Sequence, residues 1–332
     1  MNNDLSSYFE DPEFKEALEK YEGMVKNHTP AYFDADELTD IAEYYASKGR
    51  QIEAEAAIDF ALQLHPNDTD ALIFRARSLA MKGRLDEAYM VMDLIEDRSD
   101  REVRFLKADL LMEEKRMEEA DHVFEELAAY EEGKLETLID IILAYIDANQ
   151  EALAKKWIKH VGETYDLASL SQKNQKFRDL LCDFYITFNN PEAAIPLLQA
   201  TLDCYPYSIN HWNSLGKCYL STNDYEEAHE AIDFALAIDD SNAEALTLKA
   251  FCYQQSGELQ KSCDYYLRLA EQQENKTRAY LALAKTYFEM QDYTSSIYYI
   301  EALLDNKDAL SKYELSELYG DIALCHAALK HI

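Results

Sequence analysis

The same arrangement of small and large apolar residues recurs along most of this 332-residue chain, at steps of about 34 residues. Residues 212–219 read Trp-Asn-Ser-Leu-Gly-Lys-Cys-Tyr, and a turn at Asn223 and Asp224 separates them from a second stretch with apolar residues at helical spacing. If residue 209 is position one, other units begin at residues 35, 69, 101, 135, 175, 243 and 277. Repetition at this step predicts a solenoid, in which each unit buries its apolar face against its neighbours.

Three positions of the repeat hold side chains of similar size in nearly every unit. Position eight is small in almost every unit: Ala42, Ala76, Ala108, Ile142, Cys182, Gly216, Ala250 and Ala284. Position twenty is always alanine or serine: Ala54, Ala88, Ala120, Ala154, Ala194, Ala228, Ser262 and Ser296. Position eleven is always large: Tyr45, Leu79, Leu111, Tyr145, Tyr185, Tyr219, Tyr253 and Tyr287. Small residues where two helices cross and large ones toward the next unit predict a stack of helix pairs.

Turn-forming residues are scarce. Eight glycines and six prolines are too few for the tight turns of a β-sandwich or barrel, so we predict an all-α fold. No two glycines lie within five residues of each other, which excludes the glycine loops that bind phosphate or dinucleotides. Position fifteen, where a left-handed helix end is expected, holds Gly49, Gly83 and Gly257 in three units and Asn149, Asn189 and Asn223 in three others.

The pattern resembles the tetratricopeptide repeat (TPR), a pair of antiparallel helices. The resemblance implies a right-handed superhelix of about eight helix pairs over residues 35–310, with a cap helix within residues 1–34 and a last helix within residues 311–332. Six extra residues within 166–174 are expected to lengthen a loop or the following helix. The last helix matches the start of a ninth repeat, so it is either a natural cap or the result of truncation.

Charge excludes several classes of partner. The 64 acidic and 32 basic residues give a net charge of −32, which repels nucleic acid and anionic lipid. No stretch approaches 18 consecutive apolar residues, so we expect no membrane insertion. The N-terminus lacks the basic start and apolar run of a signal peptide, and the six cysteines form no C-x-x-C pair. These features predict a cytoplasmic protein.

No catalytic motif is complete. His229 and Glu230 begin an H-E-x-x-H pattern, but its last position is Asp233, so the second zinc-binding histidine is missing. The chain contains neither a G-x-S-x-G motif nor a D-x-[DN]-x-[DN]-G calcium loop. We therefore expect no catalytic residue, no metal ion, no cofactor and no enzymatic activity. Cys218 and Cys252 fall at position ten, where cysteine is expected to act as a small buried apolar residue.

In this family, positions two, five, nine, twelve and thirteen face an inner groove that holds peptides. The resemblance implies a groove lined by Glu43, Ile73, Arg77, Phe105, Asp109, Met112, Glu113, Ile139, Leu143, Asp183, Lys217, Phe251 and Lys285. Further carboxylates in the first four repeats are Asp36, Asp70, Glu102, Glu136 and Asp147, and Arg77 is the only base there. No repeat has Lys at position five or Asn at position nine, so the family's clamp for acidic chaperone tails is absent.

The acidic half of this groove predicts a Lys/Arg-rich, amphipathic peptide as ligand, although excess acid also serves solubility alone. We therefore expect a non-catalytic protein–protein interaction scaffold that binds a protein or peptide in its concave groove. The alternative is an accessory subunit of an enzyme or secretion complex, which docks by its convex face or its ends. A stripe of Leu315, Leu318, Ile322 and Leu329 also predicts self-association through the C-terminal end, if no further helix covers it.

Overall fold

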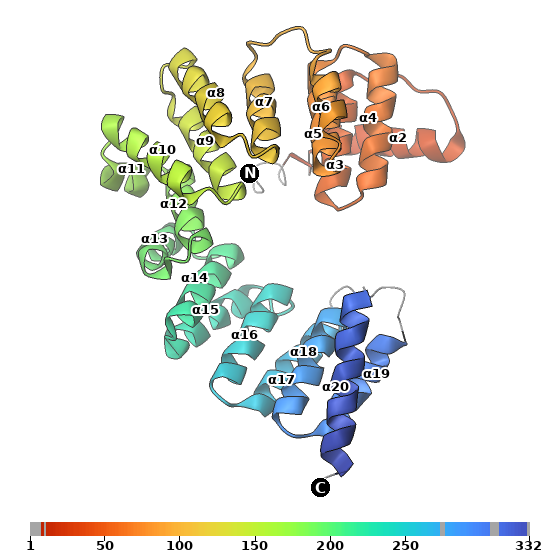
Figure 1. Cartoon of the computed structure of the whole chain (residues 1–332), viewed down its shortest axis with the longest axis vertical. Coiled ribbons are helices and arrows are strands. Elements are labelled where there is room, and N and C mark those ends of the chain that lie inside the picture. The colour runs from red at the N-terminus through yellow and green to blue at the C-terminus, as the bar shows by residue number, and fades with distance from the viewer. Residues whose placement is uncertain (1–7, 10, 273–275, 306–311, 331–332) are drawn as a thin grey trace. The chain divides into compact units, whose positions relative to one another are not determined.

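The computed structural model describes residues 8–9, 11–272, 276–305 and 312–330, and within these ranges every regular element is an α-helix (Figure 1). The chain divides into two compact units, Met1–Ala144 and Tyr145–Ile332, and the division falls inside one helix. We call them unit 1 and unit 2. None of the helices in the described ranges is long and apolar enough to cross a membrane.

Each repeat contributes a first helix, A, and a second helix, B. The A helices are α3 (Ala35–Ser47), α5 (Thr69–Met81), α7 (Arg101–Glu113), α9 (Leu135–Asp147), α12 (Gln175–Thr187), α14 (Ile209–Thr222), α16 (Ala243–Gln255) and α18 (Lys276–Glu289). The B helices are α4 (Gln51–Leu64), α6 (Leu85–Met92), α8 (Met117–Tyr130), α10 (Glu151–Thr164), α13 (Pro191–Cys204), α15 (Tyr225–Ile238), α17 (Leu259–Ala270) and α19 (Tyr293–Leu304). Seven of these A helices begin at the residue the sequence predicts, and α18 begins one residue early.

The small residues of the repeat lie where its two helices cross. Ala42 on α3 and Ala54 on α4 are fully buried, and the same holds for Ala108 and Ala120 in the third repeat. In the sixth repeat the approach is closer still, because a Cβ added to Gly216 would lie 2.8 Å from Cγ1 of Ile232. The size of the residue at position eight therefore sets how closely each pair packs.

Most A helices end in a left-handed residue at position fifteen. Gly49, Gly83 and Gly257 have φ between 72° and 76°, and the three predicted asparagines also have positive φ. Lys115 and Gln291 adopt the same conformation, which their side chains do not favour. In each case the next residue's N–H bonds back into the helix, as Arg50 N–H does to the Tyr45 carbonyl at 2.8 Å. The turn is thus imposed by the repeat and not only by glycine or asparagine.

The N-terminal helix α2 (Pro12–Asn27) covers the apolar side of the first repeat. Asp11 caps it by accepting the Glu13 N–H at 2.8 Å, and Pro12 occupies its first position. Phe14 and Tyr21 are buried against the cluster that α3 and α4 form. This helix agrees with the cap that the sequence predicts.

The extra residues of unit 2 form a separate short helix, α11 (Leu167–Lys173), so the expectation of a longer loop or longer following helix is wrong. Arg178 on α12 is 5% exposed, and its Nη1 donates to the carbonyls of Ser171 and Gln172 at 3.1 and 3.2 Å. Its Nε donates to Thr201 Oγ1 at 2.7 Å. These bonds satisfy carbonyls at the end of α11 and fix that helix to the repeat.

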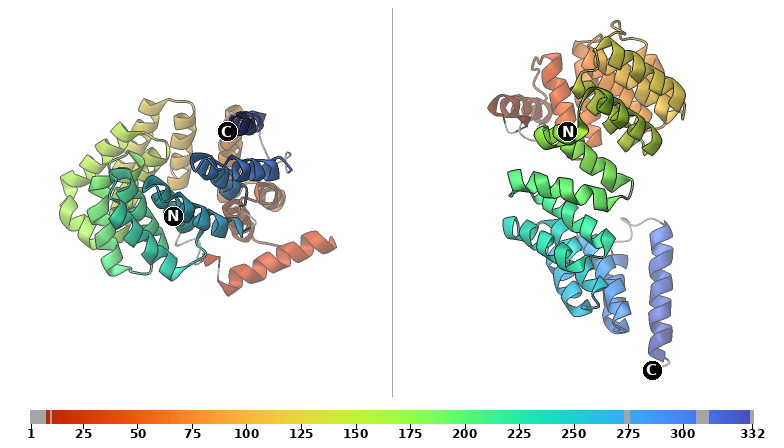
Figure 2. Two further views of the ribbon diagram at one scale, coloured as in Figure 1. Left: turned by 90° about the horizontal axis from the view of Figure 1, so that it is seen from below. Right: turned by 90° about the vertical axis from the view of Figure 1, so that its left-hand side faces the viewer.

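The last helix, α20 (Lys312–Lys330), lies beside α19 as one unbroken helix (Figure 2). Leu318 is 4% exposed and packs with Ile300 and Leu303, and Leu315 and Ile322 are partly buried at the same cluster. The expected uncovered stripe is therefore largely covered within the chain, and that expectation is corrected. Apolar side chains still exposed on this helix are Tyr319, Leu324 and Leu329.

Candidate functional site

The A helices of the first three repeats line a pocket of about 450 Å³ in unit 1. We call it the acidic pocket, and its lining residues are Asp36, Thr39, Asp40, Glu43, Asp70, Ile73, Phe74, Arg77 and Glu102. Most of them occupy positions two, five and nine of successive repeats, so matching positions of α3, α5 and α7 meet there. The pocket lies on the helix A face that the family resemblance assigns to peptide binding.

Three of its carboxylates stand in the first turns of the helices. Asp36, Asp70 and Glu102 each stand two residues after the N-cap residue of their helix, α3, α5 and α7 respectively. Free N–H groups and the helix dipole favour negative charge at this place. Each repeat therefore stabilises one acid locally, and stacking three repeats brings the acids to one surface.

Arg77 is the basic side chain that lines the acidic pocket. Its Nη2 lies 3.5 Å from Glu102 Oε2 and its Nε lies 3.5 Å from Asp109 Oδ2, so it links α5 to α7. Arg101, which stands at position one and outside the predicted groove positions, also reaches Glu102, at 2.7 Å. Asp36, Asp40, Glu43 and Asp70 nevertheless form no ion pair among the described residues, although the charge of Arg77 partly offsets the negative charge around Glu43.

The crowding of acids changes their proton affinity. Burial, followed by the negative charge of neighbouring carboxylates, raises the pKa of Glu43 and of Asp70, and burial is the main cause that raises the pKa of Asp40. Tyr8 donates a hydrogen bond to Asp40, and this bond raises the pKa of Tyr8 to about 12. The pKa of Asp109 is also raised by burial, against the opposing effect of Arg77. The pocket is thus a place where negative charge is incompletely compensated.

The structure brings some of the predicted groove residues together and not others. Glu43, Ile73 and Arg77 line the acidic pocket, with Ile73 as a nearly buried floor residue. Asp109 lies beside it through Arg77. Phe105 is 7% exposed and packs on Phe124, with ring centroids 5.2 Å apart.

Two apolar predictions are therefore corrected. Phe105 and Ile139 are buried packing residues and do not line an open groove, because both stand at position five, which is also buried at Thr39, Ile73 and Asn213. Met112 and Leu143 are partly buried, and Glu113 is exposed. The acidic pocket also contains Asp40 and Phe74, which the sequence reasoning missed. Asp40 and Phe74 both occupy position six, in the first and second repeats. An acid and an aromatic residue at the same position of neighbouring repeats were the signal that could have indicated them.

The predicted residues of unit 2 are more dispersed. Lys217 on α14 forms an ion pair with Glu244 on α16, so its charge is used within the unit. Asp183 on α12 is exposed, although partial burial and Asp179 raise its pKa. Phe251 is 41% exposed and Lys285 is exposed. None of these four side chains lines the pocket of about 480 Å³ that unit 2 contains.

The chemistry available to the acidic pocket is binding of positive charge. Among the described residues no group of three His, Cys, Asp or Glu side chains has metal-binding geometry. Cys182 and Cys218 are not activated thiols, because burial raises the pKa of Cys182 to about 12 and that of Cys218 to about 11. Carboxylates above an apolar floor of Ile73 and Phe74 suit a cationic side chain with an aliphatic stem.

A family model described as "Tetratricopeptide repeat" matches residues 39–89 and 213–277. These segments contain the first two helix pairs in part and most of the sixth and seventh repeats. The chain is a tetratricopeptide repeat protein. TPR arrays are scaffolds for protein–protein interaction, and the chain is of this general kind.

Similar proteins include one curated relative and several solved structures. The formate-dependent nitrite reductase complex subunit NrfG of Escherichia coli O157:H7 is 26% identical over 191 residues, which cover 55% of this chain and 89% of NrfG. A TPR protein from Parabacteroides merdae is 16% identical with a TM-score of 0.48, covering 76% of this chain and 98% of that one. MamA is 19% identical with a TM-score of 0.40, covering 51% and 97%.

Proposed function

We propose that this TPR protein is a non-catalytic scaffold whose acidic pocket binds a Lys/Arg-rich, amphipathic segment of a partner protein. The observation that carries the proposal is the imbalance of charge in that pocket. Asp36, Asp40, Glu43, Asp70 and Glu102 surround a single lining guanidinium, and that guanidinium already bonds Glu102 and Asp109. A partner's cations would relieve the repulsion among the remaining acids.

Two physical effects support a basic segment. Negative charge concentrated in a recess attracts cations over a Debye length of about 8 Å, which speeds association and weakens in high salt. Lasting affinity needs apolar contact as well, because exposed ion pairs contribute only about 1 kcal/mol or less each. Ile73 and Phe74 supply an apolar surface between the acids, so a segment with both kinds of side chain fits best.

The proposal is tested by reversing the charge of the pocket without touching its core. Asp36, Glu43 and Asp70 are exposed and form no ion pair in the described chain, so all three are changed to Lys together. The partner is captured from the native source with the unaltered protein, and its affinity is then measured for both proteins at several salt concentrations. We expect the variant to bind about 100-fold more weakly and to lose most of its salt dependence.

A matched control separates the pocket from net charge. Asp86→Lys, Glu96→Lys and Glu118→Lys change the charge of unit 1 by the same amount, and Asp86 and Glu118 also lie in first turns of helices. None of the three lines the acidic pocket. If this control weakens binding as much as the pocket variant, the acids act only through overall charge and the pocket is not the site.

A second candidate is supported by the similarity to NrfG, a subunit of a nitrite reductase complex. On this reading the protein is an accessory subunit that holds an enzyme component, and the acidic pocket is one of its contacts. Capture from the native source distinguishes the readings: a stoichiometric enzyme complex favours the accessory subunit, whereas diverse partners that share a basic segment favour a general scaffold.

Self-association through α20 is part of the proposal in a corrected form. Leu318 is buried within the chain, so Leu324, which is 59% exposed, is the residue to change. We expect Leu324→Glu to weaken any concentration-dependent association seen by analytical ultracentrifugation. A dimer of unchanged affinity in this variant would place the interface elsewhere.

A further inference from the structure

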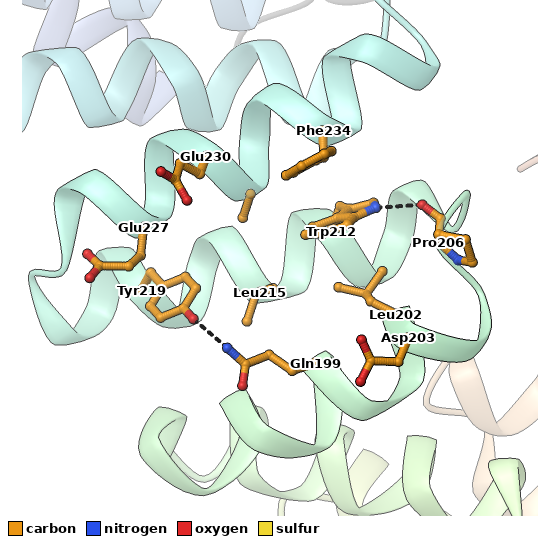
Figure 3. Close-up of a pocket in the computed structure, with 11 residues that line it drawn as sticks. Gln199, Leu202, Asp203, Pro206, Trp212, Leu215, Tyr219, Glu227, Glu230 and Phe234 are labelled. Carbon is orange, nitrogen blue, oxygen red and sulfur yellow. Dashed lines mark hydrogen bonds between the residues drawn. The ribbon is translucent and has the colours of Figure 1, made fainter.

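A second pocket, of about 480 Å³, lies in unit 2 between the B helices α13 and α15 and above the A helix α14 (Figure 3). We call it the aromatic pocket. Its lining residues are Gln199, Leu202, Asp203, Pro206, Trp212, Leu215, Tyr219, Glu227, Glu230, Ala231 and Phe234. All of them belong to the fifth and sixth repeats, so the pocket is separate from the acidic pocket of unit 1.

The aromatic walls of this pocket are held in place. Trp212 Nε1 donates to the Pro206 carbonyl at 2.8 Å, and the Trp212 ring stacks on Phe234 with centroids 4.5 Å apart and planes 18° apart. Gln199 Nε2 donates to the Tyr219 hydroxyl at 2.9 Å. Figure 3 shows Tyr219 and Trp212 on either side of Leu215, with both rings bordering the same space. These contacts restrain the rings, so little freedom would be lost on binding.

Carboxylates stand on both sides of the rings. Asp203 comes from α13, and Glu227 and Glu230 come from α15 (Figure 3). All three are exposed, and none of them has a basic partner or a hydrogen-bond donor in the described part of the chain. Glu227 and Glu230 also contribute, after burial, to raising the pKa of Tyr219. The pocket therefore joins π-faces to uncompensated negative charge, the combination that attracts cations.

The equivalent groove 34 residues further along the chain contains its own cations. There Lys249 replaces Leu215, Lys261 replaces Glu227 and Arg268 replaces Phe234. Lys249 is 2% exposed, and its Nζ lies 2.6 Å from Asp233 Oδ1 and 5.5 Å from the centroid of the Tyr253 ring. Lys261 lies over the same ring at 5.1 Å and pairs with Glu258.

The size of one residue explains why the sixth repeat leaves this space open and the next two repeats do not. Position 23 of the seventh and eighth repeats is tyrosine, and these side chains stack on the tyrosine at position eleven. Tyr265 lies 5.6 Å from Tyr253 at 27°, and Tyr299 lies 5.6 Å from Tyr287 at 6°. In the sixth repeat position 23 is Ala231, so no ring covers Tyr219 there in the described structure.

We infer that the aromatic pocket binds an arginine side chain of a partner protein, in the space beside Tyr219 and between Glu227, Glu230 and Asp203. In the neighbouring groove the equivalent ring, Tyr253, has the chain's own Lys249 and Lys261 beside it, whereas here the cation must come from outside. A planar guanidinium replaces the stacked tyrosine ring of the next two repeats and bonds carboxylates on both walls, which a lysine ammonium does less well.

The test uses the full chain and a defined probe. The probe is the acetylated and amidated peptide Ala-Ala-Arg-Ala-Ala, with the citrulline and lysine peptides of the same length as comparisons. Binding is followed by the indole N–H signal of Trp212 in NMR spectra, which Trp157→Phe assigns because the chain has two tryptophans. We expect saturable shifts with the arginine peptide, at least about tenfold weaker binding of the lysine peptide, and none with the uncharged citrulline peptide.

Two variants introduce residues that the neighbouring repeats carry at the same positions. Glu227→Lys supplies an internal cation like Lys261, and Ala231→Tyr fills the space like Tyr265; each is expected to abolish the shifts. Glu226→Lys, an exposed change on the same helix outside the pocket, is the control and is expected to bind within about twofold of the unaltered chain.

Three results would overturn the inference. Equal binding of arginine and citrulline peptides would remove the role of charge, and equal binding of arginine and lysine peptides would remove the role of the planar group. Undiminished binding by Glu227→Lys would place the peptide elsewhere. If the Trp212 signal instead changes with protein concentration alone, and Glu227→Lys stops this change, the occupant is a second copy of the chain.

Discussion

Units 1 and 2 are built from the same helix pair but compensate their charged side chains differently. In unit 2 three cations hold parts of the repeats together: Lys249 is buried beside Asp233, Lys217 pairs with Glu244, and Arg178 bonds the end of α11. In unit 1 the acidic pocket leaves four carboxylates without an ion pair in the described chain, and the pKa values of Asp40, Glu43 and Asp70 are raised.

The difference shows which part of the sequence is free to serve binding. Small residues at positions eight and twenty are needed in both units, because the helices cross there. Charges at positions two, six, seven and nine are not needed for that packing, and they differ between units. The aromatic pocket is the exception within unit 2, since its acids lack the lysines that the next repeat provides.

The largest effect is expected from replacing Arg178, a buried cation of unit 2. Arg178→Ala leaves carbonyls of Ser171 and Gln172 and the Thr201 hydroxyl without their donor, and it opens a cavity. We expect unit 2 to lose about 3 kcal/mol of unfolding free energy in urea. Arg77→Ala in unit 1 removes only half-exposed ion pairs and is expected to cost about 1 kcal/mol or less. Equal losses would contradict the distinction between structural and surface cations.

The next effect concerns the packing that both units share. Gly216→Ala places a Cβ 2.8 Å from Ile232 Cγ1, so the helices of the sixth repeat must move apart. We expect a loss of about 2 kcal/mol. Gly320→Ala in α20 is the matched control, because nothing lies within 4 Å of the added atom. It is expected to stabilise the helix by up to about 1 kcal/mol, as measured by thermal unfolding. A neutral Gly216→Ala would mean that position eight tolerates a larger residue here.

The smallest effect is a pH dependence at the acidic pocket. Because the pKa of Glu43 is raised in the folded state, the folded chain binds its proton more tightly than the unfolded chain does. The protonated Glu43 therefore contributes to the free energy of unfolding at pH values below the ordinary carboxyl pKa. This contribution is lost as the pH rises through the pKa that Glu43 has in the folded chain. Glu43→Gln should therefore stabilise α3 and α5 at neutral pH, by about 0.5 kcal/mol after solvent screening. Hydrogen exchange measures this, with Glu96→Gln as control; an equal gain in the control would contradict the prediction.

The sequence predicts the fold well because small and large side chains recur at the same positions of each repeat. Starts at residues 35, 69 and 101 coincide with helix starts, since small and large residues must alternate at fixed places. The left-handed ends at Lys115 and Gln291 could not be read in the same way, because the repeat imposes there a backbone that these side chains do not favour.

The candidate site was predicted less completely. Glu43 and Arg77 line the acidic pocket as the family positions imply, whereas Phe105 and Ile139 are buried. Phe105 and Ile139 both stand at position five, which is also buried at Ile73 and Asn213, so the groove position implied by the family did not give the burial of these side chains. The extra residues did not indicate the helix α11, because the end of α11 is fixed by the side chain of Arg178 on the following helix.

The most direct test of the central claim is a charge-swap measurement on the acidic pocket. Two synthetic 16-residue amphipathic helices, identical except that one carries Lys and the other Glu on its polar face, are titrated into the unaltered chain and into the variant Asp36→Lys, Glu43→Lys and Asp70→Lys. We predict that the unaltered chain binds the Lys peptide and that the variant prefers the Glu peptide, with both preferences fading in high salt. If the variant still prefers the Lys peptide with unchanged affinity, the acidic pocket does not recognise the partner.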